Sequence, residues 1–474
     1  MSKQNRQSIW SVILQQEWIF LSRTNYARWI FLAMALLMSL GWMGGYSFRY
    51  TQATNAIIRN QDAKERLDKA ITTNPAEAKL LSRFRNPFDP YAAGNRFGSP
   101  YAEKPPFSYS ALAVGQGDIY PDSYLITLRD LEQVVSKAAI QNPVQIYHGV
   151  MDLAFIIAFI LPLLIIGYMY NIRSDEEEQN RMGWILSSGI TMKSFLVSRL
   201  AIRFLIFLGI FQILYFMANM GSGFIWGWEG LPMAWLTTAW QISLYFLFWA
   251  LICGLVNLNK SNSISQALTL CSVWVVLCLI IPGIIQYSVN RKYPLPNRLE
   301  MISAGREASI EASQAASKMM NAFMQDHPEL SKDTSNMDDF TKRLFATQLL
   351  VEEKVNPILA SFDIALENQY KSIAQKVYFS PVLTAYDLLA QTGRNDFETQ
   401  RDFYRQISAF HEEWKDFFNY YLSGSGTFDA KVYDQLPQFE YHPGTKKKNY
   451  HHLYLIFVPL VIIAMGTFLL RKKL

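Results

Sequence analysis

The sequence predicts a mostly α-helical, polytopic membrane protein with six transmembrane helices and two large, mainly helical extracytoplasmic domains. Three observations predict this fold class. Half of the 474 residues are apolar, yet the mean hydropathy is only +0.05, as expected when membrane spans alternate with aqueous segments. The apolar residues gather in six long runs that are almost free of charge. Lys and Arg residues flank these runs in a pattern that gives one consistent orientation.

Each of the six apolar runs is long enough to cross a bilayer, because about 20 helical residues span the roughly 30 Å of hydrocarbon. A soluble buried helix is rarely uncharged over such a length. We expect transmembrane helices at residues 27–48, 148–171, 201–222, 232–257, 264–289 and 449–470. Pro162, Pro282 and Pro459 fall inside three of them, where the missing backbone hydrogen bond kinks a helix. A kink that serves packing is favoured there over a moving hinge.

Gly41 and Gly45 lie four residues apart in the first apolar run. Small residues at this spacing share one face of a helix and let another helix approach closely. They are candidate residues for helix packing, although the spacing also occurs often by chance.

The orientation follows from basic residues in short loops, which stay in the cytoplasm. We expect cytoplasmic segments at residues 1–26, 172–200, 258–263 and 471–474, extracytoplasmic domains at 49–147 and 290–448, and a short outer loop at 223–231. Both termini are then cytoplasmic, and the first apolar run is retained rather than cleaved. The three cysteines all lie in apolar runs, so no disulfide framework holds the outer domains. These features fit a bacterial inner membrane.

Two segments on the predicted cytoplasmic face are too polar to span. Residues 8–24 mix Trp and Ile with Gln and Glu and indicate a helix lying on the membrane surface, with a plain cytoplasmic helix as the alternative. The loop after the second span opens with an acidic run at 175–178 and continues with a short apolar helical pattern. Such a loop could dock a soluble partner, and a solvated connector explains it equally well.

Together these segments resemble the ABC-2 type permeases of ATP-binding-cassette (ABC) transporters. The resemblance lies in QQEWIFLSR before the first span, in the acidic run, and in WILSSGITMKSFLVSRL leading into the third span. It implies that the loop is a coupling helix seated in a cleft of a separate ATPase subunit, which binds ATP and Mg²⁺. It further implies a second permease copy or a paralogue, as a homodimer or heterodimer. The residues to which it assigns the coupling role are Glu176, Glu177, Glu178, Arg181, Gly183 and Trp184.

The second outer segment extends the resemblance over nearly the whole chain. YPLPNRLE at residues 293–300 and the aromatic-rich run at 378–418 are similar to a branch of ABC-2 permeases. That branch has a large extracytoplasmic domain of unknown function and is often linked to multicopper-enzyme maturation. It implies work on a substrate or on a periplasmic or outer-membrane partner.

Helical patterns are expected in the outer segments at residues 56–81, 300–325, 338–375 and 396–420. The last of these has a stripe of aromatic residues, which predicts a core face rather than a ligand site. Gly393 is placed to end one helix and Asp396 to cap the next. Residues 84–124 are rich in Pro, Gly and aromatics, and predict an irregular loop that packs on the other domain or binds a partner.

Several chemistries have no support in the sequence. It has no G-x-x-x-x-G-K-[ST] loop, so the chain is not expected to hydrolyse ATP, and no nucleophile elbow, H-E-x-x-H or C-x-x-C motif. We therefore expect no catalytic, cofactor-binding or metal-binding residues. His451 and His452 would point about 100° apart on a helix, so anchoring at the membrane interface is favoured over a shared metal. A net charge of +5 without a basic helix argues against nucleic-acid binding.

The sequence thus favours a permease subunit that couples ATP hydrolysis in another subunit to transport or to work on a partner, surrounded by membrane lipid. The alternative is a non-transport membrane scaffold or sensor whose outer domains bind a partner. A membrane enzyme has the least support, because no nucleophile or metal constellation is present.

Overall fold

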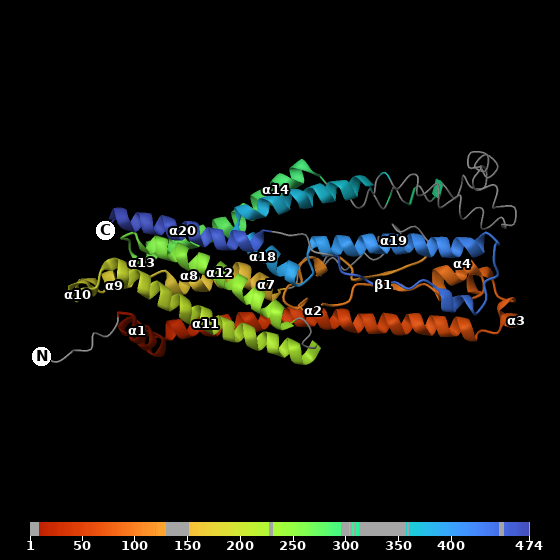
Figure 1. The fold of residues 1–474 in the computed structure, drawn as a ribbon, viewed down its shortest axis with the longest axis horizontal. Helices are drawn as coiled ribbons and strands as arrows, with labels where there is room; N and C mark the ends of the chain where they lie inside the picture. Colours follow the sequence, from red (N-terminus) through yellow and green to blue (C-terminus); the bar gives the residue numbers. More distant parts are fainter. Residues whose placement is uncertain are drawn as a thin grey trace.

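The computed structural model describes residues 9–107, 109–118, 120–128, 151–226, 231–294, 360–444 and 450–473, with isolated residues between 303 and 357. Among the described residues, six helices are long and apolar enough to cross a membrane, which confirms a mostly helical, multi-pass membrane protein. They are Asn25–Thr72, Leu153–Glu178, Met192–Ile225, Pro232–Asn257, Ser263–Lys292 and His451–Leu469. Figure 1 shows an elongated molecule, with the helix bundle at one end and a second body of structure, around α19, at the other end.

Helix α2 (Asn25–Thr72) differs from the predicted arrangement, in which a span ended at 48 and a separate helix began at 56. It continues without a break because no Gly or Pro lies between Tyr46 and Thr72 to end it. At 48 residues it is about 72 Å long, more than twice the bilayer's hydrocarbon thickness. One rigid element therefore runs from the bundle far into the second body of structure (Figure 1).

In the described residues, the remaining helices of the bundle form five further spans. Two of these spans contain a π-helical turn that ends two residues before a proline, at Ile156–Ile160 before Pro162 and at Val276–Ile280 before Pro282. The bundle elements are α7 (Leu153–Phe155), α8 (Leu161–Met169), α11 (Met192–Trp226), α12 (Leu231–Asn257), α13 (Ser263–Val275), α14 (Ile281–Lys292) and α20 (His451–Lys473). Pro459 lies inside α20.

Side chains from neighbouring helices bind the carbonyl groups near these prolines. Tyr245 Oη donates to Ala158 O at 2.5 Å, and Trp274 Nε1 donates to Phe159 O at 2.9 Å. A proline cannot donate to the carbonyl four residues earlier, so a tertiary donor at Ala158 satisfies a group that the helix cannot. Both carbonyl groups are therefore bound by side chains of neighbouring helices.

Helix α18 (Pro381–Thr392) differs from the prediction that residues 290–448 form one outer domain. Its buried side chains Val382, Ala385, Leu389 and Ala390 belong to the core of the helix bundle. The sequence does not predict that α18 lies in the bundle, because the helix carries Asp387 and two threonines and is too short to span a membrane. The turn Val377–Phe379 and a helix at 360–376 precede it.

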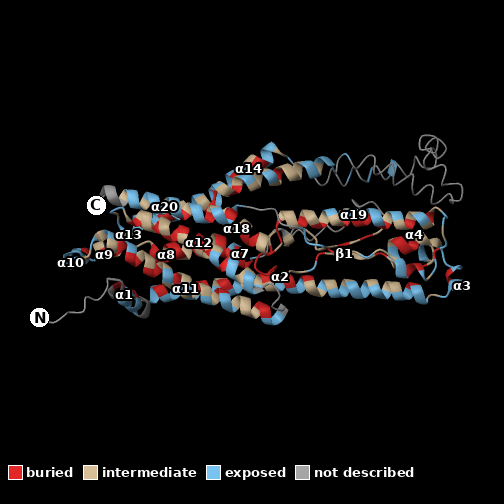
Figure 2. Ribbon diagram, in the orientation of Figure 1, coloured by how far each residue is buried: buried red, intermediate tan, exposed pale blue. Residues whose placement is uncertain are grey.

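Side chains from the described residues of 49–128 and 397–444, called the distal module here, form a second hydrophobic core, whereas Tyr109, Leu112 and Ala113 of this module pack in the core of the bundle. Helix α19 (Phe397–Leu422) supplies Phe403, Ile407, Phe410 and Trp414, which confirms that the aromatic stripe is core. Tyr124 and Ile126 from the first segment pack into the same core, so the two predicted outer domains form one body in the described residues. Figure 2 colours the ribbon red where residues are buried.

The described residues of 84–124, predicted to be irregular, contain only short elements and pack on the second segment of the distal module. Trp414 Nε1 donates to Gly94 O at 3.1 Å, and Tyr433 Oη donates to Pro87 O at 2.6 Å. Strands β1 (Tyr101–Glu103) and β2 (Ser123–Leu125) pair antiparallel. The other short elements are α3 (Pro75–Ala78), α4 (Pro90–Ala92), the π-turn Ala93–Phe97, and the 3-10 turns Arg83–Arg85, Gly115–Asp118 and Val432–Gln435.

Candidate functional site

The loop between α8 and α11 folds into two short helices, α9 (Ser174–Glu178) and α10 (Met182–Ser187). Asn180 and Gly189, at φ 55° and 83°, have left-handed backbone conformations that turn the chain after each helix. Asn and Gly adopt this conformation at the lowest cost. Helix α10 consequently lies at the extreme end of the bundle, the end that also holds α1 and the last turn of α20 (Figure 1).

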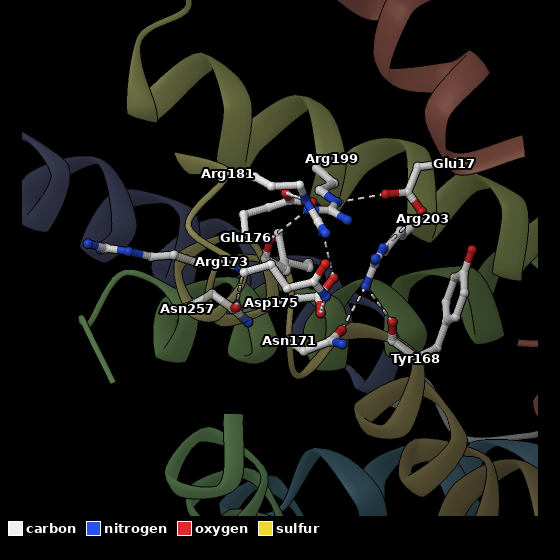
Figure 3. A network of polar contacts seen from close by, with 12 residues as sticks. Glu17, Tyr168, Asn171, Arg173, Asp175, Glu176, Arg181, Arg199, Arg203 and Asn257 are labelled. Atoms are coloured by element: carbon white, nitrogen blue, oxygen red, sulfur yellow. Dashed lines mark hydrogen bonds and ion pairs between the residues drawn. The ribbon is translucent and has the colours of Figure 1, made fainter. Parts of the chain in front are cut away.

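Four buried charges fasten this loop to α1 (Ile9–Arg23) and to α11 (Figure 3). Arg199 donates from Nε to Glu17 Oε1 and from Nη1 to Glu176 Oε1, both at 2.7 Å. Arg203 Nε lies 3.0 Å from Glu17 Oε2. All four side chains are buried, and Arg203 is fully so. Because two cations meet two anions, the set carries no net charge, the condition under which buried ions are tolerated.

The same guanidinium groups hold the end of α8. Arg203 Nη1 donates to Tyr168 O at 3.0 Å and to Asn171 Oδ1 at 3.1 Å, and Arg199 Nη1 donates to Ile172 O at 3.0 Å. Carbonyl groups at a helix C-terminus lack partners within the helix, and cations there also interact favourably with the helix dipole. The arginines of α11 therefore fix where α8 ends and α9 begins.

The acidic run is engaged within the chain. Arg181 Nε donates to Glu176 Oε2 at 2.6 Å, and Arg173 Nε donates to Glu177 Oε1 at 2.7 Å. The hydrogen bond to Glu176 raises the pKa of Arg181. Glu178 Oε1 accepts a hydrogen bond at 2.7 Å from the backbone N–H of Ser263. These bonds hold α9 rigidly rather than leaving its carboxylates free.

The turn between α12 and α13 is joined to the same loop. Arg173 Nη1 donates to Leu258 O at 2.9 Å, and Ser174 Oγ donates to Gln266 Oε1 at 2.9 Å. Asn257 Oδ1 accepts from the backbone N–H of Arg173 at 3.1 Å. The loop thus connects α1, α8, α11, α12 and α13 at one end of the bundle.

The six residues predicted from the sequence separate into two groups. Glu176 and Glu177 are turned into the chain, and Arg181 and Glu178 lie at the boundary with bonds to it. Gly183 and Trp184 lie on the outer side of α10: the Trp184 side chain is 81% exposed, and no atom lies within 4 Å of a Cβ built on Gly183. A partner could reach α10 but not the carboxylate of Glu176.

Helix α1 presents two different faces. Ile13 and Glu17 are buried against α11, whereas Leu14, Trp18 and Ile19 are exposed. An apolar face beside a bundle end is typical of a helix at a membrane interface. The location of α1 on the membrane surface remains a prediction, in which its exposed apolar side chains would face the lipid.

Gly41 and Gly45 both allow close approach, as predicted, but to different neighbours. A Cβ on Gly41 would lie 2.6 Å from the Ile156 side chain and 3.0 Å from the Leu153 backbone, so α7 packs directly on α2 there. A Cβ on Gly45 would lie 1.8 Å from Ala111 O. The second glycine therefore admits a loop of the distal module rather than a helix.

Glu17, Arg199 and Arg203 also belong to the site, although the sequence did not predict them as part of it. The sequence holds one signal for the two arginines, since Arg199 and Arg203 lie one turn apart on the same face of a helix.

The described residues contain no group of three or more His, Cys, Asp or Glu side chains that could hold a metal ion. His451 is buried, with Nε2 2.5 Å from Asp387 Oδ2 and Nδ1 2.9 Å from Tyr378 Oη, and so links α20 to α18. His452 is exposed. The two adjacent rings thus lie in different surroundings.

Comparison with known proteins gives one match. Residues 298–442 match the model of a family described as a domain of unknown function (DUF3526). This region includes α18 and α19 and most of the predicted second outer segment. No curated protein and no solved structure matches the chain.

Proposed function

We propose that the chain is the transmembrane permease subunit of an ATP-binding-cassette transporter, and that α10 is the surface on which a separate ATPase subunit docks. The observation that carries the proposal is the contrast within one loop. Helix α10 is exposed, with Trp184 at its surface, while α9 directly before it is fixed to the bundle by buried ion pairs. A loop that only connects two spans does not need buried ion pairs that fix it to the bundle.

These ion pairs can transmit a movement of α10 to the spans. A push on α10 reaches Glu176 through Arg181, then Arg199 and Glu17, and so moves α11 and α1 together. The bonds from Ser174 and Glu178 carry the same movement to α13. Packed, fully bonded contacts transmit displacement because they resist deformation.

The remaining features of the proposal follow from the orientation of the spans. The loop faces the cytoplasm of a bacterium, both termini lie on that side of the inner membrane, and the distal module is extracytoplasmic. ATP and Mg²⁺ are bound by the ATPase, and a second permease copy or a paralogue completes the transporter. ATP hydrolysis then drives substrate export or work on a periplasmic or outer-membrane partner.

Trp184→Ala tests the docking surface. Tagged protein, purified in mild detergent from its native host, should bring down an ATPase that carries a phosphate-binding loop. Trp184→Ala should lower the recovery of that ATPase by about tenfold or more, since a central exposed aromatic anchor contributes roughly 2 kcal/mol or more to binding. Its apparent unfolding temperature should not change, because the side chain is 81% exposed.

Leu80→Ala is the matched control, since Leu80 is an 88% exposed apolar residue of the distal module. It should leave the recovery of the ATPase unchanged. Charge reversal of Glu176 is a poorer test, because it would also break the buried ion pairs. If wild-type protein brings down no ATPase, the proposal fails and a membrane scaffold or sensor becomes the better description.

A further inference from the structure

Helix α18 contacts the three spans that contain Pro162, Pro282 and Pro459. Its N-cap residue Ser380 donates from Oγ to Leu277 O, at 3.1 Å, within the π-turn before Pro282. The ring of Tyr386 lies edge-on to Phe159, in the π-turn before Pro162, at 5.8 Å between centroids. These contacts place α18 against the points where two spans depart from regular α-helix.

The third contact is with α20, which contains Pro459. Asp387 of α18 accepts from the buried His451 at 2.5 Å. Leu388 packs with Leu244 of α12 and Leu455 of α20 in a small apolar cluster. Helix α18 is therefore held on several sides by the bundle.

The two π-turns are also connected to each other. Trp274 lies two residues before the second π-turn begins at Val276, and its Nε1 donates to Phe159 O in the first. π-turns inside α-helices are rare and are often found at functional sites. Here both π-turns lie beside α18 and contact it.

The other end of α18 is fixed to the distal module. Gly393 follows α18, and a Cβ there would lie 2.9 Å from Ala113 O. Asn395 Nδ2 donates to the same carbonyl at 2.8 Å, and Asp396 then caps α19 by accepting from the Thr399 N–H. The chain therefore passes from α18 into the main helix of the distal module through a turn that close backbone contacts hold in place.

We propose that α18 is a mechanical link that makes the two π-turns, before Pro162 and Pro282, and the distal module change conformation together. A change of backbone geometry at either π-turn displaces a carbonyl or ring that α18 contacts, and the tight turn at 393–396 carries that displacement to α19. The link is a property of the chain itself and does not depend on which subunit or ligand drives it. It goes beyond the proposed function, because it assigns the path between the spans and the distal module.

The test measures the position of α19 relative to the bundle while one kink is weakened. Spin labels are placed through an unnatural keto amino acid at Val197 of α11 and Tyr420 of α19, two exposed positions, with the chain in nanodiscs without an ATPase. Trp274→Phe removes the donor to Phe159 O while keeping an aromatic ring. We expect the distance distribution between the labels to broaden or to shift relative to that of the wild type.

Trp235→Phe is the matched control, because Trp235 Nε1 has no hydrogen-bond partner among the described residues. Its distribution should equal that of the wild type. Ser380→Ala, at the other kink, should change the distribution as Trp274→Phe does, and Ser380→Thr, which keeps the hydroxyl group, should restore it.

Hydrogen exchange at residues 156–162 shows whether the bond was broken, since those amides should then exchange several-fold faster. Faster exchange there with an unchanged distance distribution would overturn the proposal. Because no ATPase is present, this failure is distinct from failure of the proposed function.

Discussion

At the scale of single residues, Glu17 is the acidic group to which both buried arginines of α11 bind. Glu17→Gln should destabilise the protein by about 3–5 kcal/mol, because it removes one anion and leaves the buried charges of Arg199 and Arg203 undercompensated. The measurement is the apparent unfolding temperature of purified protein in detergent. Glu65→Gln, whose i,i+4 partner Lys69 is exposed, should cost under about 0.5 kcal/mol. Equal stability of both variants would show that the buried set does not hold α1 to the bundle.

Gly45 tests a different single-residue constraint, the space between α2 and the distal module. Gly45→Ala should impair folding, because a Cβ would lie 1.8 Å from the Ala111 carbonyl oxygen and the contact is with backbone, which cannot rotate away. Gly209→Ala, also in a spanning helix, meets no atom within 4 Å and should be neutral or slightly stabilising. The yield of monodisperse protein in detergent checks both. A well-folded Gly45→Ala protein would mean that the loop at Ala111 packs elsewhere.

At the scale of elements, local patterns predicted the spans well, because hydropathy over about 20 residues decides whether a helix can cross a bilayer. Capping was also local: Gly393 follows the end of α18, and Asp396 caps α19, as expected. The insertion of α18 into the bundle was not predictable in this way. Its sequence, with Asp387 and Gln391, resembles an ordinary amphipathic helix, and only its tertiary contacts reveal its place.

The candidate site shows the same division. The exposed residues Gly183 and Trp184 could be selected from the sequence of the loop itself. The bond between Glu17 and Arg199 joins positions 182 residues apart, and no local pattern specifies such a pair. The loop sequence alone therefore assigns the acidic run at 175–178 to a partner, whereas in the structure much of this run holds the loop to its own bundle.

At the scale of the whole molecule, two segments separated by most of the chain form the distal module, and a buried lysine lies where they meet. Lys104 Nζ, next to strand β1, donates to Gln400 Oε1 of α19 at 3.1 Å. Burial lowers the pKa of Lys104 to about 8, although Asp122 and Asp396 oppose the change. The charged form is therefore disfavoured in the folded protein.

The sign of the pH effect follows from this shift. The folded-state pKa is about 8 against 10.5 for the exposed group, so between these values the unfolded chain binds more protons and stability rises with pH. Below about pH 8 both states are protonated, and the burial costs on the order of 3 kcal/mol. Lys104→Met removes the titrating group, so the wild type should gain stability relative to this variant as the pH rises from 7 to 10.

The apparent unfolding temperatures of both proteins across that range measure the gain. Lys79→Met, at an exposed position of the distal module, should differ from the wild type by a constant amount over the same range. If the Lys104→Met curve also runs parallel to the wild type, the lysine is solvated. The joint between the two segments would then be open to water, contrary to a module held together by one continuous core.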